Sequence, residues 1–393
     1  MRIPAGAAIP LAMAGGAAFG LLAPDWARGL APVSSVFLRL IRSIVAPLLF
    51  GVLVSAMAGA GSLRGLGRLG LRTLIYFEAV TTLALLIGWG AVALFRPGDG
   101  VVLKAADAPR ASAMTFADAV ERSFPASLFE AMARGDVLQI VVFCLLFGLA
   151  VNAVGGRGEP VRAFCEALTQ VSFRYTSIVM YAAPAGVFAA MAAALGEGGL
   201  GVLAGLGRFT AVAWAAQLFY AAAVLLPVLL WARVPLRAFA RAAREPVLVG
   251  AGTTSSAAAL PATLASMREF GVPERVLGLV VPLGLSFNAA GSTIHLAMAA
   301  FFVAQAAGRS LPSWEQAAIL LTLKLTSKGV AGIPRANFVI LGALFGSFQL
   351  PMEGLAMLLG VDAAIDMVRT GVNVLGHCVA PTAIARWEGA SRS

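Results

Sequence analysis

The stretch GVDAAIDMVRTGVNVLGHC (residues 360–378) places five polar side chains in an almost wholly apolar part of the chain. Successive members are four, three, four and four residues apart, so a helix carries all of them along one face. On a soluble helix this face would simply meet water, whereas in a bilayer each group is costly and indicates a function. The five are Asp362, Asp366, Arg369, Asn373 and His377.

The composition of the whole chain favours the bilayer. Hydrophobic residues make up 60% of the 393 residues and charged residues 12%, against roughly a quarter charged in soluble proteins. The run FTAVAWAAQLFYAAAVLLPVLLWA (209–232) alone exceeds the roughly 20 residues that a helix needs to cross the hydrocarbon core. Because soluble cores are not this continuously apolar, the sequence predicts an all-α polytopic membrane protein.

The net charge of +10 is a topology signal rather than a sign of nucleic-acid binding, because the basic residues are not interleaved with aromatic side chains. They gather in short loops such as 64–72 and 233–244, which the positive-inside rule assigns to the cytoplasm. We therefore expect a bacterial-type inner-membrane protein with both termini cytoplasmic. Segment 4–22 is expected to stay as the first span rather than to be cleaved as a signal peptide.

The first part of the chain predicts ordinary spans, and residues 96–136 predict an external loop with a short helix. The expected spans are 5–22, 34–60, 72–95, 137–155, 165–194 and 205–232.

Two later segments, 246–267 and 316–349, are interrupted by small and polar residues, at 252–256 and 326–337. Each half is about ten residues, too short to span a membrane. The flanking charges predict that the first segment enters from the cytoplasm and the second from outside. Either break alone could be a structural kink, but the pair predicts two re-entrant hairpins of an inverted repeat, which is typical of transporter binding sites.

Four motifs together resemble the dicarboxylate/amino acid:cation symporters, the glutamate transporter family. The motifs are SS followed by ALP (255–261), SFNAAGST (286–293), SKGVAGIP (327–334) and DAAIDMVRTGVNVLGH (362–377). The resemblance covers essentially the whole chain. It implies the elevator fold: eight transmembrane helices plus two re-entrant helical hairpins, assembled as a homotrimer.

The resemblance also implies a division of the chain into two bodies. The scaffold would comprise residues 1–71 (spans 1 and 2) and 96–204 (spans 4 and 5 with the external loop). The moving transport domain would comprise 72–95 (span 3) and 205–393 (span 6, hairpin 1, span 7, hairpin 2 and span 8).

The resemblance implies a site for an acidic amino acid. Asp366 would bind the ammonium, and Arg369 would bind the side-chain carboxylate, which suits the planar fork of a guanidinium. Ser292 stands where the family has a threonine. The alternative is that Asp366 and Arg369 merely pair and hold two helices together. The other residues expected to contact substrate are Ser255, Ser256, Gly332, Ile333, Thr370 and Asn373.

The sodium sites of the family are incomplete here. Sodium-coupled members carry one aspartate in an Asn-Met-Asp-Gly-Thr motif and another one turn beyond the last-span asparagine. This chain has Ala290 and His377 at those positions. A hard cation in a dry site needs oxygen ligands and negative charge, so we expect weak or absent sodium dependence. The remnants of the cation sites are Gly284, Asn288, Asn373 and Thr81.

Protons or fixed charges are the alternatives to sodium. Glu78, His295 and His377 are ionisable groups on core spans, and imidazole titrates near neutral pH. Lys328, in the interruption of the second broken segment, could stand in for a cation or could extend to the outer water. The sequence leaves these options open.

The function expected from these observations is secondary transport of L-aspartate or L-glutamate, proton-coupled or uncoupled. The alternative is a C4-dicarboxylate carrier of the same fold that uses Arg369 alone. A channel or ligand-gated sensor is a further class, and an enzyme is not expected because no nucleophile–base pair or metal cluster is evident. We expect no cofactor and no nucleic-acid partner, only substrate, proton and membrane lipid.

Overall fold

A computed structural model describes residues 5–59, 67–101, 103, 124–134, 137–327 and 336–389, and over these ranges the chain forms helices and no strand. The first part contains α1 (Ala5–Leu22), α2 (Pro24–Arg28), α3 (Ala31–Ser43), α4 (Val45–Gly59), α5 (Gly67–Phe95), α7 (Leu128–Arg134), α8 (Val137–Val154), η2 (Gly155–Gly158), α9 (Glu159–Val179), η3 (Met180–Ala182) and α10 (Ala183–Gly198).

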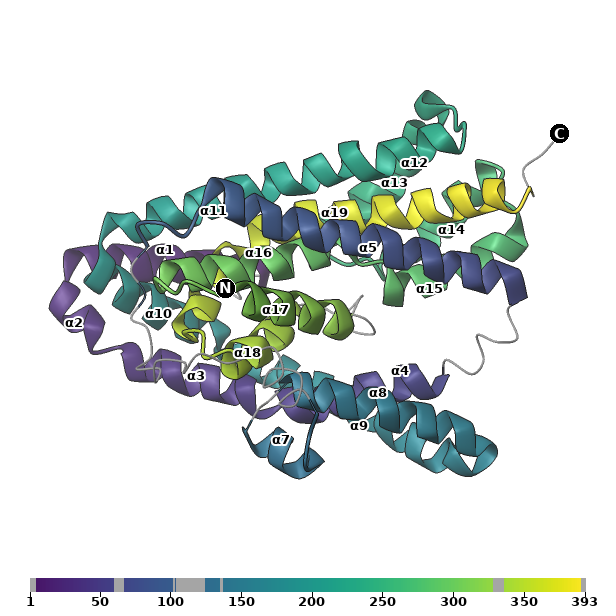
Figure 1. The fold of residues 1–393 in the computed structure, drawn as a ribbon. Coiled ribbons are helices and arrows are strands. Elements are labelled where there is room, and N and C mark those ends of the chain that lie inside the picture. Colours follow the sequence, from purple (N-terminus) through teal and green to yellow (C-terminus); the bar gives the residue numbers. More distant parts are fainter. Residues whose placement is uncertain are drawn as a thin grey trace.

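The second part contains the helices that carry the polar motifs. They are α11 (Leu200–Tyr220), the π-helical turn η4 (Ala221–Leu225), α12 (Leu226–Trp231), α13 (Leu236–Thr253), α14 (Leu260–Glu269), α15 (Glu274–Phe287), α16 (Ala290–Ala306), α17 (Ser313–Thr326), α18 (Ala336–Ser347) and α19 (Glu353–Trp387). In Figure 1, α5, α11 and α19 run lengthwise along one side of the molecule, and α3, α4, α8 and α9 lie along the other.

Several helices are long and apolar enough to cross a membrane. Among the described residues four stretches meet both criteria: Arg68–Phe95, Val142–Thr176, Leu200–Trp231 and Glu274–Ala306. The predicted span 5–22 is α1, and the predicted short helix in the external loop is α7. Two predicted spans are not single helices. Residues 34–59 are divided between α3 and α4, and 165–194 is divided by the 3-10 turn η3, which is followed at once by a Pro near the start of α10.

Small residues allow close helix packing. A Cβ added at Gly16 or Gly20 of α1 would lie 2.4 Å or 2.6 Å from a carbonyl oxygen of α10, belonging to Phe188 and Ala192 respectively. This four-residue spacing of glycines is the small-residue pattern that brings helices together where lipid removes the hydrophobic driving force. The same occurs between α5 and α16, where a Cβ at Gly88 would lie 2.5 Å from the Ile294 carbonyl oxygen.

The first interrupted segment forms two helices joined by a turn. Helix α13 ends at Thr253, Thr254 adopts a left-handed conformation (φ 50°), and α14 begins at Leu260. Helix α13 is longer than the ten residues expected, because it extends back to Leu236 through a basic amphipathic start.

The second interrupted segment has α17 and α18 as its arms, and its centre, 328–335, lies outside the described residues. Helix α17 runs antiparallel to α5, because Gln316 and Lys324 of α17 contact Trp89 and Glu78 of α5 respectively. It therefore starts beside the end of α5 that is remote from the basic residues near Arg68 and Arg72.

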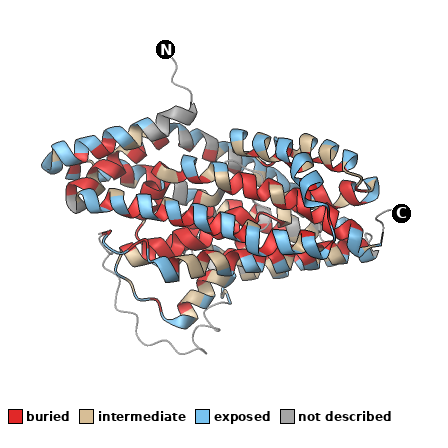
Figure 2. Ribbon diagram, turned by 90° about the horizontal axis from the view of Figure 1, so that it is seen from above, coloured by how far each residue is buried: buried red, intermediate tan, exposed pale blue. Residues whose placement is uncertain are grey.

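The five polar residues of 360–378 do lie on one helix, as the spacing predicted. Helix α19 runs for 35 residues, and most of its length is buried among α11, α13, α15 and α16. Figure 2 shows the buried residues concentrated along the interior of the elongated bundle. All five are buried except Asp366, which is intermediate.

Candidate substrate and cation site

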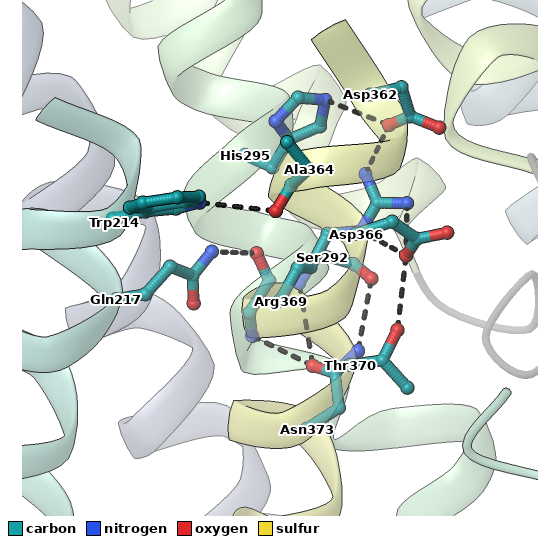
Figure 3. A network of polar contacts seen from close by, with 11 residues as sticks. Trp214, Gln217, Ser292, His295, Asp362, Ala364, Asp366, Arg369, Thr370 and Asn373 are labelled. Atoms are coloured by element: carbon teal, nitrogen blue, oxygen red, sulfur yellow. Dashed lines mark hydrogen bonds and ion pairs between the residues drawn. The ribbon is translucent and has the colours of Figure 1, made fainter. Parts of the chain in front are cut away.

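Arg369 is held between two carboxylates of its own helix. Its Nη1 donates to Asp362 Oδ1 at 3.1 Å, while Nη2 and Nε donate to Asp366 Oδ1 at 2.6 Å and 3.1 Å (Figure 3). The residue is only 3% exposed. The alternative that Arg369 and Asp366 join two helices is wrong, because both lie on α19, three residues apart.

The carboxylate of Asp366 is used on one oxygen only. The two bonds from Arg369 and a third from Thr370 Oγ1, at 3.0 Å, all end on Oδ1. Within the described residues Oδ2 accepts no hydrogen bond. Arg369 likewise has five N–H donors, and these contacts use three. The cluster therefore presents an open carboxylate oxygen and two open guanidinium donors side by side.

Asn373 connects α19 to the start of α16. Its Oδ1 accepts from the backbone N–H of Gly291 at 2.8 Å and of Ser292 at 3.4 Å, and its Nδ2 donates to Ser292 Oγ at 3.2 Å (Figure 3). These N–H groups have no partner within α16, because the first turn of a helix leaves its donors unsatisfied. Asn373 thus caps α16 from a neighbouring helix.

The cap is needed because the membrane segment 274–306 is broken in the middle. Helix α15 ends at Phe287 and α16 begins at Ala290, so Asn288 and Ala289 are not helical. The Asn288 side chain is 1% exposed, and neither its oxygen nor its nitrogen has a hydrogen-bond partner within the described residues. Buried amide side chains without a hydrogen-bond partner are rare, and an ion or a water molecule is one group that can bind to them.

His377 lies at this break. A Cβ added at Gly284 would lie 3.3 Å from His377 Cδ2, and one added at Gly376, next to His377, would lie 3.4 Å from Asn288 Nδ2. The structure therefore brings three predicted cation-site remnants together: Gly284, Asn288 and His377. Another predicted member of the cation site, Asn373, instead caps α16.

His295 lies at the other end of the arginine cluster. It is fully buried on α16, with Nε2 4.0 Å from Asp362 Oδ1 and the ring edge-on to Phe209. Neither ring nitrogen has a hydrogen-bond partner among the described residues. His295, one of the residues predicted to carry a proton, thus lies beside the arginine cluster, next to Asp362.

Glu78 and Thr81 meet Lys324 rather than the histidines. Lys324 Nζ lies 2.7 Å from Thr81 Oγ1, 3.0 Å from the Glu78 carbonyl oxygen and 3.1 Å from Glu78 Oε2. Thr81 and Glu78, both predicted as ion-site residues, therefore contact the Lys324 ammonium of α17.

The tip of the first interrupted segment contributes Ser255 and Ser256. They lie in the turn that precedes α14, which begins at Leu260, and Ser255 Oγ accepts from the Ala258 N–H at 3.2 Å. A Cβ built at Gly371, the residue after Thr370, would lie 3.6 Å from the Ala251 Cβ, so α13 packs on α19 at this level. Gly332, Ile333 and Lys328 lie outside the described residues.

Two side chains of α11, the buried Gln217 and the exposed Trp214, also contact the helices of this network and were not predicted. Gln217 Nε2 donates to the Gly291 carbonyl oxygen at 2.9 Å, and Trp214 Nε1 donates to the Ala364 carbonyl oxygen at 3.1 Å. The available signal was an amide within the apolar run 209–232, but its partner could not be known without the packing.

The helical architecture, the broken segments and the buried acidic–basic cluster define a polytopic membrane transporter. The chain belongs to the sodium:dicarboxylate symporter family, which it matches over residues 6–387. The resemblance inferred from the four motifs is thus confirmed.

Relatives with named activities cover nearly the whole chain. The chain is 36% identical to a proton/sodium-glutamate symport protein of Geobacillus stearothermophilus, over 93% of this chain and 89% of that protein. It is 37% identical to a C4-dicarboxylate transport protein of Anaeromyxobacter sp. (strain K), over 96% and 88%. It is also 37% identical to a proton/glutamate-aspartate symporter of Bacillus subtilis (strain 168), over 98% and 95%.

Proposed function

We propose that this chain is a secondary active transporter of acidic amino acids, L-aspartate or L-glutamate. The observation that carries the proposal is the open Oδ2 of Asp366 beside the open donors of Arg369. A substrate ammonium would bind the open oxygen of Asp366, while a substrate carboxylate would accept from the remaining N–H donors of Arg369.

Coupling in this proposal does not use sodium. Ala290 lacks a carboxylate, and His377 brings an imidazole rather than a carboxylate to Gly284 and Asn288, so neither position supplies the negative charge that a desolvated cation needs. Proton coupling would use His295, His377 or Glu78, and transport without coupling is the alternative. One relative is named a proton/glutamate-aspartate symporter, and another is named for both ions, as a proton/sodium-glutamate symport protein.

The proposed mechanism is an elevator in a homotrimer of the inner membrane, with both termini cytoplasmic. The transport domain would comprise 72–95 and 205–393, and the scaffold 1–71 and 96–204. The separation of α5, α11 and α19 from α3, α4, α8 and α9 in Figure 1 supports this division. The break between α15 and α16, beside the interrupted segments, supports a site in the middle of the membrane.

A C4-dicarboxylate is the second candidate substrate, because relatives of equal identity carry that name. Such a substrate would use Arg369 but offer no ammonium to Asp366. A channel or sensor would neither saturate in flux nor exchange labelled substrate.

The variant Asp366→Asn separates the two substrates. It should weaken aspartate binding far more than succinate binding, because only aspartate has an ammonium to lose its charged partner; a hydrogen bond to a charged group contributes about 1.5–3 kcal/mol. Binding of both ligands to the purified protein is the measurement. Equal loss for the two would remove the ammonium role from Asp366.

A further inference from the structure

Lys324 places a positive charge between two helices, at a point that the substrate cluster does not include. It lies in the last turn of α17, and its side chain is 15% exposed. Three oxygens of α5 lie within 3.1 Å of Nζ: the Thr81 hydroxyl, the Glu78 carbonyl and the Glu78 carboxylate. A helix C-terminus favours a cation, so α17 itself supports the charge.

The oxygens are fixed by α5 itself. Thr81 is 5% exposed, and its Oγ1 donates to the Phe77 carbonyl oxygen at 2.6 Å, which leaves its lone pairs directed toward Lys324. The Glu78 carbonyl oxygen also accepts from Thr82 Oγ1, at 2.6 Å. A carbonyl, a hydroxyl and a carboxylate held in this way are the ligand types that bind hard cations.

We propose that Lys324 is a permanently attached cation, whose ammonium occupies a monovalent-cation site between α5 and α17. The chain thereby makes the contact between these helices without an ion from solution. This assigns to Lys324 the role of determining ion dependence. The inference rests on the proposed function only where aspartate affinity is the readout.

The ordinary alternative is a surface ion pair between Lys324 and Glu78. The Glu78 side chain is 44% exposed, and pairs of that kind contribute little to stability. An ion pair and a cation site differ in one property: only a cation site can be refilled from solution once the tethered charge is removed.

The test is chemical rescue of Lys324→Ala, which leaves the oxygens of α5 in place. Aspartate affinity and the thermal unfolding midpoint are measured in choline chloride, and again after choline is replaced by methylammonium, sodium or lithium. The wild type should give the same affinity in all four. Lys324→Ala should bind aspartate at least about fivefold more weakly in choline, the lower end of typical coupling between sites, and should recover affinity and midpoint with a small cation.

Matched variants distinguish a cation site from an ordinary polar contact between α5 and α17. Gln316→Ala removes a second polar contact between these helices, the 2.9 Å bond from Trp89 Nε1, without changing charge, and should show no cation response. Lys324→Arg keeps the charge and should stay indifferent to cations. Adding Thr81→Val to Lys324→Ala should abolish the rescue, because it removes one of the oxygen ligands.

Two results would overturn the inference: unchanged affinity of Lys324→Ala in choline, or a loss that no small cation restores in either affinity or unfolding midpoint. If Lys324→Ala fails to fold in choline, its yield of folded protein in methylammonium tests the same point. The unfolding midpoint also keeps the two proposals apart. A wild type that binds no acidic amino acid would refute the proposed function, whereas the cation response of the variant would still decide the role of Lys324.

Discussion

Gly291 shows how closely the site is built at the scale of single residues. A Cβ at this position would lie 2.4 Å from the Arg369 carbonyl oxygen and 3.1 Å from Asn373 Oδ1. The absence of a side chain therefore lets the start of α16 reach the turn of α19 that carries Arg369. Without that approach the Gly291 N–H could not donate to Asn373 at 2.8 Å.

Gly291→Ala should consequently destabilise the protein by about 1–3 kcal/mol, the usual cost of overpacking. The neighbouring α15 offers a matched control, because a Cβ at Gly278 would meet nothing within 4 Å. Gly278→Ala should be neutral or stabilising by up to about 1 kcal/mol, since Gly is unfavourable inside a helix. Unfolding midpoints of both variants are the measurement, and a Gly291→Ala protein as stable as the wild type would refute the close approach.

The sequence predicted the polar face of α19 but not which neighbouring residues each of its side chains contacts. Spacing alone aligned Asp362, Asp366, Arg369, Asn373 and His377, and the structure confirms one helix. That Asp362 is the second partner of Arg369 follows from the i to i+7 spacing and could have been anticipated. The contacts of Gln217 and Lys324 could not, because they depend on which helices become neighbours.

At the scale of elements, interruptions position the site. The turn after α13 and the break between α15 and α16 each free backbone groups from a regular helix. Composition revealed the first of these through its run of Gly, Thr and Ser. The break at Asn288 and Ala289 was not predicted, because alanine is a good helix former and local propensity is overridden there by packing against α19.

The proposed elevator predicts that α1 and α19 must slide past each other. A Cβ built at Gly360 of α19 lies 3.5 Å from the Met13 Cβ of α1, within the range for a disulfide. Oxidation of the double variant Met13→Cys, Gly360→Cys should therefore arrest aspartate uptake, and reduction should restore it. The measurement is uptake into proteoliposomes before and after reduction.

A cross-link inside the proposed scaffold is the control. A Cβ at Gly196 of α10 would lie 3.3 Å from the Ala27 Cβ of α2, and both helices belong to the body that should not move. Uptake by the oxidised Ala27→Cys, Gly196→Cys protein should persist. Full activity of the Met13–Gly360 cross-link, with the bond verified by mass, would rule out sliding at this contact.

At the scale of the whole molecule, charged groups determine whether an ion can be coupled to substrate binding. An ion tightens substrate binding only if it has a site that favours the bound state. In this chain His377 lies beside Asn288 and Gly284, and Lys324 lies among the oxygens of Glu78 and Thr81. His377 thus brings an imidazole to two of the predicted cation-site residues, and Lys324 brings an ammonium to Thr81 and pairs with the Glu78 carboxylate beside it.

The most direct test is uptake of labelled aspartate into proteoliposomes, with sodium and pH gradients imposed separately. Uptake should saturate and counter-exchange, and its apparent affinity should be the same in sodium and in choline. Any driving force should follow the pH gradient. A tenfold or greater rise in aspartate affinity on adding sodium, roughly 1.4 kcal/mol of coupling, or uptake that occurs only with a sodium gradient, would contradict sodium-independent transport by this chain.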